Sequence, residues 1–561
     1  MLPPIEHLAE PAILSTSGER SESEHSAAVK KSLSRGDFTI SRNDLSRRDW
    51  LKTSGVLGLT VVGSGGGIRL ASADRGQCPS VINIGSRREL FIDEFMIDTL
   101  SGKAALRMHH PTPHEVAIVH DAPWEGSGSG YHTVFKDGDL YRMYHRGSHL
   151  DVKNGRLDTD RHQPFYCYAE STDGIHWKKP KLGIVKFKGS RQNNIILEGL
   201  GTHNFAPFKA QNPDSPAEAR YKALAGMKSE GRLFAFQSAD GIHWSQMSQK
   251  PVITNRAFDS QNIAFWDPTI GRYRAYWRIF TAGVTTQKEW KPAGYRAIRT
   301  ATSRDFLHWD NEADLTYVNS PVEQLYTNQV APYYRAPHIL IGLPTRYVDR
   351  GWSESMRALP DRENRELRAS AKQRYGTAIT ECLLMASRDG VRFKRWNEAF
   401  LRPGIGRSGT WQYGQHYIAC HVVETESSLP GAPHEISLYA TEDYWHGGGG
   451  TLRRYTLRID GFVSIQAPMT GGEFLSKPLE FSGSRLTMNF STSVAGSVRL
   501  EIQDASGGPI EGFTLADCPD HFGDTLDRTV TWKGGVDVGK PVRLRFVLKD
   551  ADLFSFRFIE F

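Results

Sequence analysis

One seven-residue turn recurs along this chain and limits its fold more than any other feature. Residues 171–177 read Ser-Thr-Asp-Gly-Ile-His-Trp, residues 238–244 repeat them with one change, and 303–309 and 387–393 are weaker copies. A turn repeated at intervals of about 65 to 85 residues is typical of a radial β architecture with one turn per blade. Asp-Gly suits the bend, because glycine tolerates positive φ and aspartate accepts backbone N–H bonds. We therefore interpret Asp173, Asp240, Asp305 and Asp389 as structural.

Short alternating strands precede each turn, as a four-stranded blade requires. The expected opening strands lie near 131–135, 203–208, 258–265, 325–333 and 411–414, and 441–445 resembles a worn fifth turn. The chain is thus predicted to be all-β, with a five-bladed β-propeller over residues 85–458. We expect the strand at 89–97 to close the ring by joining the last blade. The charged insert at 361–373 predicts one amphipathic helix.

Beyond residue 458 the repeated turn gives way to alternating strands separated by Gly- and Pro-rich turns. Examples of these strands are 486–490, 498–502 and 542–548. This pattern predicts a C-terminal β-sandwich of jelly-roll type over residues 459–561.

The N-terminal region has the features of an export signal. Ser46-Arg47-Arg48-Asp49-Trp50-Leu51-Lys52 resembles the twin-arginine motif, a short apolar run follows, and Ala71-Ser72-Ala73 is a small-x-small cleavage pattern. The apolar run is too short to span a bilayer. We predict a signal region over residues 1–73, cleavage after Ala73, and a periplasmic, cell-surface or secreted product with no membrane span.

Charge and cysteine content argue against several other classes of protein. The 69 Lys+Arg nearly balance the 63 Asp+Glu, so nucleic acid is not an expected partner. Five cysteines without a CxxC pair argue against a disulfide scaffold or a zinc site. No cofactor and no metal are expected. A structural divalent ion bound by histidines in the channel is left as an alternative, although the sequence contains no HxH or HExxH spacing that would support it.

Five blades, S-x-D-G-x-x-W turns and an appended sandwich together resemble the propellers of glycoside hydrolase families 32 and 43, of the secreted bacterial type. The resemblance implies a carbohydrate substrate. The family 32 nucleophile motif W-M-N-D-P-N-G is missing from this sequence. Trp266-Asp267-Pro268 and Glu381-Cys382 imitate the R-D-P and E-C motifs, but both lie away from the start of an opening strand. Sialidases, whose Asp-box is one residue longer and whose rings have six blades, are the second choice.

Glycoside hydrolysis needs two carboxyl groups, and the inner strands of a propeller bring residues together at the channel mouth. Asp259 precedes Ser260-Gln261-Asn262, a polar run where a buried strand should be apolar, so we predict Asp259 as base or nucleophile. Glu323 or Glu125 is the predicted proton donor. The predicted substrate-binding residues are Trp124, Asp121, Asn204, Gln261, Asn262, Tyr326, Asn328, Trp411 and His416.

The leading hypothesis is an exported glycoside hydrolase that acts on an extracellular poly- or oligosaccharide through a carboxylate pair. A non-catalytic carbohydrate-binding propeller and a cell-surface interaction protein are the alternatives. Two carboxylates across one channel mouth with an aromatic ring beside them would favour the enzyme. The oligomeric state is left open.

Overall fold

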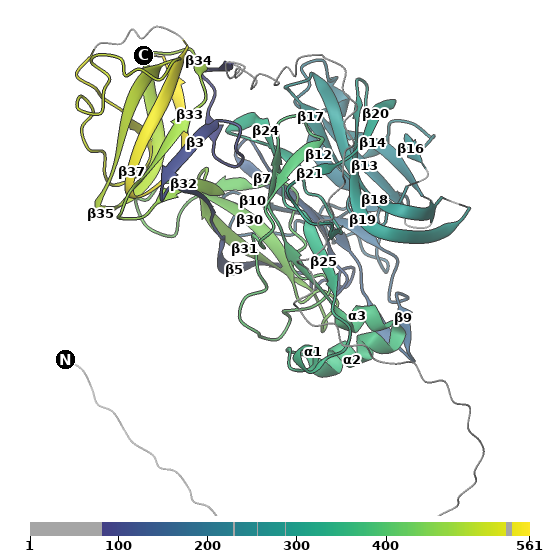
Figure 1. The fold of residues 1–561 in the computed structure, drawn as a ribbon. Coiled ribbons are helices and arrows are strands. Elements are labelled where there is room, and N and C mark those ends of the chain that lie inside the picture. Colours follow the sequence, from purple (N-terminus) through teal and green to yellow (C-terminus); the bar gives the residue numbers. More distant parts are fainter. Residues whose placement is uncertain (1–80, 228–230, 255, 287, 535–540, 561) are drawn as a thin grey trace, which may run out of the picture. The chain divides into compact units, whose positions relative to one another are not determined.

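The computed structural model describes residues 81–227, 231–254, 256–286, 288–534 and 541–560. The predicted signal region, 1–73, lies outside these ranges. Within them the chain is almost entirely β-structure, and the predicted all-β fold with a propeller followed by a sandwich is confirmed (Figure 1).

Five sheets form the blades, and the strands of each are named from the inner to the outer one. Blade one is β6 (Gly130–Asp137), β7 (Leu140–Gly147), β10 (Phe165–Ser171) and β11 (Ile195–Glu198). Blade two is β12 (Ala206–Lys209), β13 (Tyr221–Met227) and β14 (Arg232–Ser238). Two short strands, β15 (Ser245–Gln246) and β16 (Ile253–Thr254), both pair with β14 as the outer strand of this blade. Blade three is β17 (Ile263–Asp267), β18 (Arg272–Thr285), β19 (Trp290–Ser303) and β20 (Trp309–Asp314). Blade four is β23 (Ala331–Tyr333), β24 (Ala336–Gly342), β27 (Met385–Ser387), β28 (Arg392–Arg395) and β21 (Thr316–Val318). Blade five is β29 (Val423–Thr425), β30 (Glu435–Glu442), β31 (Thr451–Arg458) and β5 (Thr112–Val119).

The ring is closed by β5, which pairs with β31 as the outer strand of blade five. The expectation that 89–97 closes it was wrong, because β2 (Glu89–Leu90) pairs with β37 and β3 (Ile97–Gly102) pairs with β33, both in the sandwich. β5 is an exposed edge strand that contains Pro113, and its burial does not alternate as that of a half-buried strand does. The expected opening strand at 411–414 was also wrong, since the inner strand of blade five is β29.

The sandwich sheet is organised by two long strands, β35 (Arg485–Asp504) and β37 (Val542–Ile559), which pair on both sides of an irregularity between Thr492 and Ser497. Buried Phe474, Phe546 and Phe556 lie in its core. The remaining strands are β1 (Ile82–Gly85), β2, β3, β4 (Ala105–Met108), β32 (Val463–Ala467), β33 (Gly472–Ser476), β34 (Leu479–Phe481) and β36 (Asp524–Thr529).

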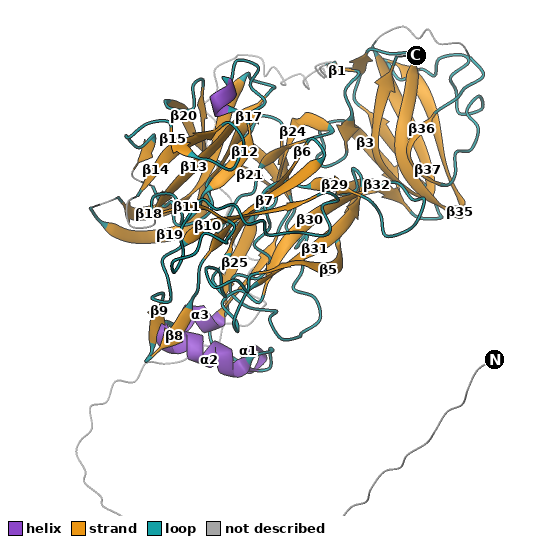
Figure 2. Cartoon of the chain, turned by 180° about the vertical axis from the view of Figure 1, so that it is seen from behind, coloured by secondary structure: helices purple, strands orange, loops and turns teal. Residues whose placement is uncertain are grey.

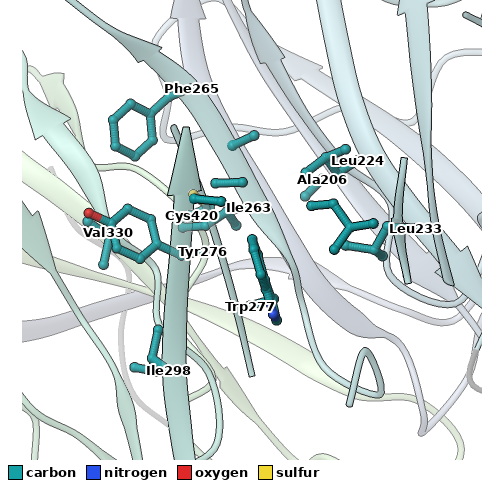
Figure 3. Close-up of a cluster of buried hydrophobic side chains, with 14 of the residues drawn as sticks. Ala206, Leu224, Leu233, Ile263, Phe265, Tyr276, Trp277, Ile298, Val330 and Cys420 are labelled. Carbon is teal, nitrogen blue, oxygen red and sulfur yellow. The ribbon is translucent and has the colours of Figure 1, made fainter. Parts of the chain in front are cut away.

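The propeller core fills the space between neighbouring blades. Trp277 of β18 is completely buried and packs among aliphatic side chains that include Leu224 and Leu233 of blade two and Ile263 of β17 (Figure 3). These contacts join blades two and three through apolar surface rather than through hydrogen bonds. Replacing such a side chain by alanine typically costs about 3–5 kcal/mol.

Each repeated turn follows the third strand of its blade and carries its own hydrogen bonds. In the second copy, Ser238 Oγ accepts a bond from Gly241 N at 2.9 Å, and Asp240 Oδ1 accepts bonds from the backbone N–H groups of Ile242 and His243 at 2.8 and 2.9 Å. Burial opposes ionisation of Asp240, but these bonds and the His243 side chain outweigh it and hold the pKa of the carboxyl below its ordinary value. The repeated aspartates are structural, as predicted.

The turns also connect neighbouring blades. Tyr144 of blade one donates its hydroxyl proton to Gly241 O in the turn of blade two at 3.0 Å, and Tyr276 of blade three donates to Gly390 O of blade four at 2.8 Å. The hydroxyl of Tyr439 in blade five makes the same bond to Gly174 O of blade one. Residues 441–445 are not a fifth copy, because they follow the second strand of blade five, β30.

A helical insert interrupts blade four between β25 (Thr345–Asp349) and β26 (Ala378–Cys382), which form a small sheet with β22 (Gln324–Leu325). It contains α1 (Glu354–Arg357), α2 (Arg362–Ala371) and α3 (Gln373–Thr377), so the helix predicted over 361–373 is confirmed by α2. The insert lies beside the hairpin β8 (Asp151–Lys153) and β9 (Arg156–Asp158), as Figure 2 shows. A short 3-10 turn at Ala217–Ala219 precedes β13 in blade two.

Asp240→Ala tests the role of the turn. Because this side chain is 51% exposed, solvent screens its interactions, and we expect a loss of about 1 kcal/mol in unfolding free energy at pH 7. A carboxylate with a depressed pKa stabilises the fold above about pH 4 and loses that effect as the pH falls further. Denaturant titration should therefore show a difference from wild type at pH 7 that shrinks below pH 4. The exposed Asp214→Ala is the control, and equal losses in both variants would contradict the assignment.

Candidate functional site

A cavity of about 720 Å³ opens on the propeller face opposite the repeated turns. Tyr131 at the start of β6, Arg146 near the end of β7 and Pro164 just before β10 line it, whereas the turn follows the other end of β10. The cavity is therefore at the channel mouth. Its wall contains the aromatic residues Tyr131, Tyr326, Tyr375, Tyr413, Tyr444 and Trp445, the arginines Arg146 and Arg374, the histidines His149, His162 and His203, and the carboxylates Asp160 and Asp259.

The aromatic wall is preorganised. Tyr413 Oη donates to Tyr326 Oη at 3.1 Å. Tyr131 and Trp445 hold φ values of +55° and +59°, in the left-handed region that side chains other than glycine rarely adopt. Such conformations cost about 1–3 kcal/mol each and persist where surrounding packing maintains them, often at ligand sites.

Asp259 is positioned by two basic side chains. His203 Nε2 lies 3.0 Å from Asp259 Oδ1, and Arg278 Nη2 lies 3.7 Å from Asp259 Oδ2. Because the Asp259 side chain is 22% exposed and lines the cavity, a bound molecule can reach the carboxylate.

Two further guanidinium groups supply positive charge to the wall. The Arg146 guanidinium lies 4.7 Å from the centre of the Tyr131 ring, and its Nη2 donates to Gly128 O at 2.8 Å and approaches Tyr444 Oη at 3.3 Å. Arg374, from α3, lies 4.6 Å from the centre of the Tyr375 ring. Arginine stays protonated in proteins, so both residues keep their charge.

The insert is held against the propeller by two buried arginines on α2. Arg368 Nη1 donates to Gln412 Oε1 at 2.7 Å and its Nη2 donates to Tyr413 O at 3.1 Å. Arg365 donates to the backbone oxygens of Thr410 and Trp411. These bonds couple the helical insert to the loop that carries Tyr413.

Below the cavity, an amide network fills the channel. Gln261 Nε2 donates to Tyr131 O, His132 O and Thr133 Oγ1 at 3.0–3.1 Å, while Gln329 Nε2 donates to Gln261 Oε1 at 2.5 Å and to Ile418 O at 2.9 Å. Asn204, Asn262 and Asn328 likewise donate to buried backbone oxygens. Asn204, Gln261, Asn328 and Gln329 thus connect different blades, whereas Asn262 bonds within its own segment.

Neither predicted proton donor lies in the cavity wall with Asp259. Glu323 is held by Arg346 at 2.9 Å and Arg395 at 2.8 Å, and Arg346 also binds Glu381. Glu125 is fully buried between His145 Nε2 at 2.8 Å and Lys179 Nζ at 2.6 Å. The structure therefore does not pair either glutamate with Asp259.

Of the predicted substrate-binding residues, Tyr326 lines the cavity. Trp124 donates to Asn194, Asp121 pairs with Lys179, Trp411 donates to Gly404 O, and His416 contacts Tyr455. Burial lowers the pKa of His416 to about 4, so this imidazole is neutral at pH 7. The predicted residues that are not part of the wall are Trp124, Asp121, Asn204, Gln261, Asn262, Asn328, Trp411 and His416.

Most residues of the wall lie away from the starts of the opening strands, where the sequence pattern places the site. Arg374 and Tyr375 lie in the helical insert, and Tyr444 and Trp445 lie in the connection from β30 to β31. The adjacent aromatic pair at 444–445, which resembles the end of a worn turn, was the available signal.

No family model matches the chain. Among curated proteins, the uncharacterized protein Rv1502 of Mycobacterium tuberculosis is 28% identical over 140 residues, which are 24% of this chain and 40% of that protein. The uncharacterized protein MT1551 of the same organism is 28% identical over 138 residues. The chain thus matches two fifths of the length of these relatives.

Solved structures similar to this chain include a thermostable family-43 glycoside hydrolase, with a TM-score of 0.37, 12% identity, and coverage of 61% of this chain and 93% of that one. An N-acetylgalactosamine deacetylase from F. plautii gives a TM-score of 0.37 and 13% identity over 64% of this chain and 94% of that one. An endo-arabinase from Bacteroides thetaiotaomicron gives 0.32 and 9% identity over 62% and 98%. Similarities at these TM-scores carry no conclusion about chemistry.

Gln329→Leu tests the amide network. The substitution leaves Gln261 Oε1 and Ile418 O without this donor, and each unsatisfied buried group costs about 1–3 kcal/mol. We expect a clear decrease in the urea midpoint, with no change for Gln192→Leu, which replaces an exposed glutamine. Equal midpoints for the two variants would exclude a stabilising role for the network.

Proposed function

We propose that the protein is a glycoside hydrolase whose substrate binds in the cavity at the channel mouth. The observation that carries this proposal is Asp259, a partly exposed carboxylate fixed by His203 and Arg278 in a wall of aromatic rings. Aromatic faces pack against the apolar faces of sugar rings, and a positioned carboxylate is what hydrolysis of a glycosidic bond requires.

The reaction needs a second carboxyl group, and Asp160 lines the same cavity as Asp259. Asp259 acts as the base or nucleophile, since it is held at the channel mouth by basic side chains. Asp160 follows β9 in the connection from β7 to β10 and protonates the leaving oxygen. Asp160 therefore takes the role that the sequence pattern assigns to Glu323 or Glu125.

The charges of the wall favour an acidic sugar. Arg278 and His203 already face Asp259, whereas Arg146 and Arg374 contact aromatic rings and backbone or hydroxyl groups. Guanidinium groups bind carboxylate, sulfate and phosphate well. We therefore expect a glycan with uronic acid or other anionic residues to bind more tightly than a neutral one.

A carbohydrate-binding propeller without catalysis is the second candidate. It is favoured by the exposure of Asp160, because an exposed carboxyl group lacks the apolar surroundings that normally tune a proton donor. The two candidates differ in whether bound sugar is cleaved.

Asp259→Asn separates these candidates. On a panel of neutral and uronic-acid-containing plant and algal polysaccharides, we expect wild type to release reducing ends and the variant to lose about 10²- to 10⁴-fold in rate while still binding. Glu323→Gln is the matched control and should remain active. Binding without cleavage by wild type would support the second candidate, and full activity of Asp259→Asn would overturn the assignment.

Arg374→Ala tests the acidic-sugar preference in the same assay. We expect the KM for uronic-acid-containing substrates to rise about tenfold, with a smaller effect on neutral ones and none in the exposed Arg220→Ala. Equal effects on both substrate types would contradict a charge-based preference.

We also propose export by the twin-arginine route with cleavage after Ala73, supported by Arg47-Arg48 and the pattern at 71–73. Within the described ranges, no helix combines the length and apolar character needed to cross a bilayer. Cell fractionation and N-terminal sequencing should find a mature protein that begins at Asp74 outside the cytoplasm. The control is a variant in which Arg47 and Arg48 are replaced by lysine, and we expect it to stay in the cytoplasm. Unchanged export of this variant would contradict the twin-arginine route.

A further inference from the structure

We infer that His120, Glu125 and His145 form a binding site for a divalent transition-metal ion of the Zn²⁺ class. One ligand atom from each residue lies within 4.8 Å of the others. His120 follows β5 of blade five, Glu125 lies in the connection to β6, and His145 is on β7 of blade one. The site is therefore placed where the propeller ring closes, and none of its three residues lines the cavity.

The spacing of the three side chains is close to that of a metal site. His145 Nε2 lies 2.8 Å and His120 Nδ1 lies 3.8 Å from Glu125 Oε1, and the two imidazole centres are 4.6 Å apart. Ligand atoms around a tetrahedral Zn²⁺ with bonds of about 2.0–2.2 Å are about 3.3–3.6 Å from one another. The two measured distances to Glu125 Oε1, 2.8 and 3.8 Å, lie on either side of this range.

Unsatisfied nitrogens point to a cation. In the part of the chain that the structure describes, the Nδ1 atoms of His120, His132 and His145 are buried without a hydrogen-bond partner. All three histidines are at most 1% exposed. A buried polar atom without a partner costs about 1–3 kcal/mol, so three in one cluster are unusual for a purely structural network. Of the three, His120 Nδ1 faces Glu125 Oε1 at 3.8 Å, and a metal ion bound there takes its lone pair and removes that cost.

His132 supports the site from outside the triad. Its Nε2 lies 2.9 Å from His120 Nε2, which leaves His120 Nδ1 directed toward Glu125. Metal-binding histidines commonly engage their other ring nitrogen in such a bond, which fixes the tautomer and the ring orientation. Two imidazoles and one carboxylate, with His132 beside them, form a donor set that suits Zn²⁺ rather than Ca²⁺ or Mg²⁺.

Lys179 competes with the metal for Glu125. Its ammonium lies 2.6 Å from Oε2, while Oε1 faces the two histidines. The carboxylate can therefore keep Lys179 on one oxygen and bind a cation with the other. The nearby positive charge weakens metal binding, so removing it should strengthen binding.

The experiment uses the purified protein after removal of metal with a chelator, titrated with Zn²⁺ and, as a spectroscopic probe, Co²⁺. We expect one ion per chain by elemental analysis and calorimetry, a higher Tm with metal, and Co²⁺ absorption bands of low coordination number. His145→Ala should lose at least tenfold in affinity, whereas the exposed His434→Ala should bind as wild type does.

Lys179→Met keeps the test decisive if His145→Ala does not fold. This variant retains all three ligands, and we expect it to bind Zn²⁺ about tenfold more tightly than wild type. No stoichiometric binding, equal affinity in wild type and His145→Ala, or affinity unchanged or reduced in Lys179→Met would each overturn the site. These experiments measure metal binding and not glycan cleavage, so their outcome does not depend on the proposed hydrolase activity.

Discussion

Closure of the ring by β5 is the constraint on which the rest of this structure depends. Blade five is complete only when Thr112–Val119 pairs with β31, which lies far along the chain. Such non-local pairing carries a loop-closure entropy cost, but it pairs the edge of β31 and leaves the exposed, Pro-containing β5 as the outermost strand. The connection that follows β5 then crosses to β6, and it places His120 and Glu125 beside His145 of blade one. Ring closure and the proposed metal site are thus consequences of the same path of the chain.

The two faces of the propeller are built by different kinds of sequence. On one face, the aspartates of the seven-residue turns accept hydrogen bonds from backbone N–H groups of the same turn. Backbone carbonyl groups of the turns accept hydrogen bonds from tyrosine hydroxyls of the preceding blades. On the other face, the connections differ from blade to blade and include the β8–β9 hairpin and the helical insert. Loops on a rigid scaffold commonly carry function, and in this protein they supply Arg374, Tyr375 and Trp445 to the cavity.

The fold was predictable where its signals are local. Four copies of the turn indicated the repeated blades, and alternating strands indicated the sandwich, whereas the fifth copy expected at 441–445 was wrong. The closing strand was missed because β5 is exposed on its outer side and interrupted by Pro113. Asp259 was found because it precedes Ser260-Gln261-Asn262, a conspicuous polar run directly before the inner strand β17. Glu323 and Glu125 were assigned catalytic roles because their partners, Arg395 and Lys179, are distant in sequence.

The sequence by itself determined the repeated architecture of blades one to four, because the turn's hydrogen bonds lie within seven residues and recur wherever the motif does. Tertiary structure alone decided the site. Whether a carboxylate faces a cavity, as Asp259 does, or an arginine, as Glu323 does, depends on side chains from separate blades and from an inserted helix. Those side chains come together only after the ring has closed, since no local pattern encodes the distances between blades.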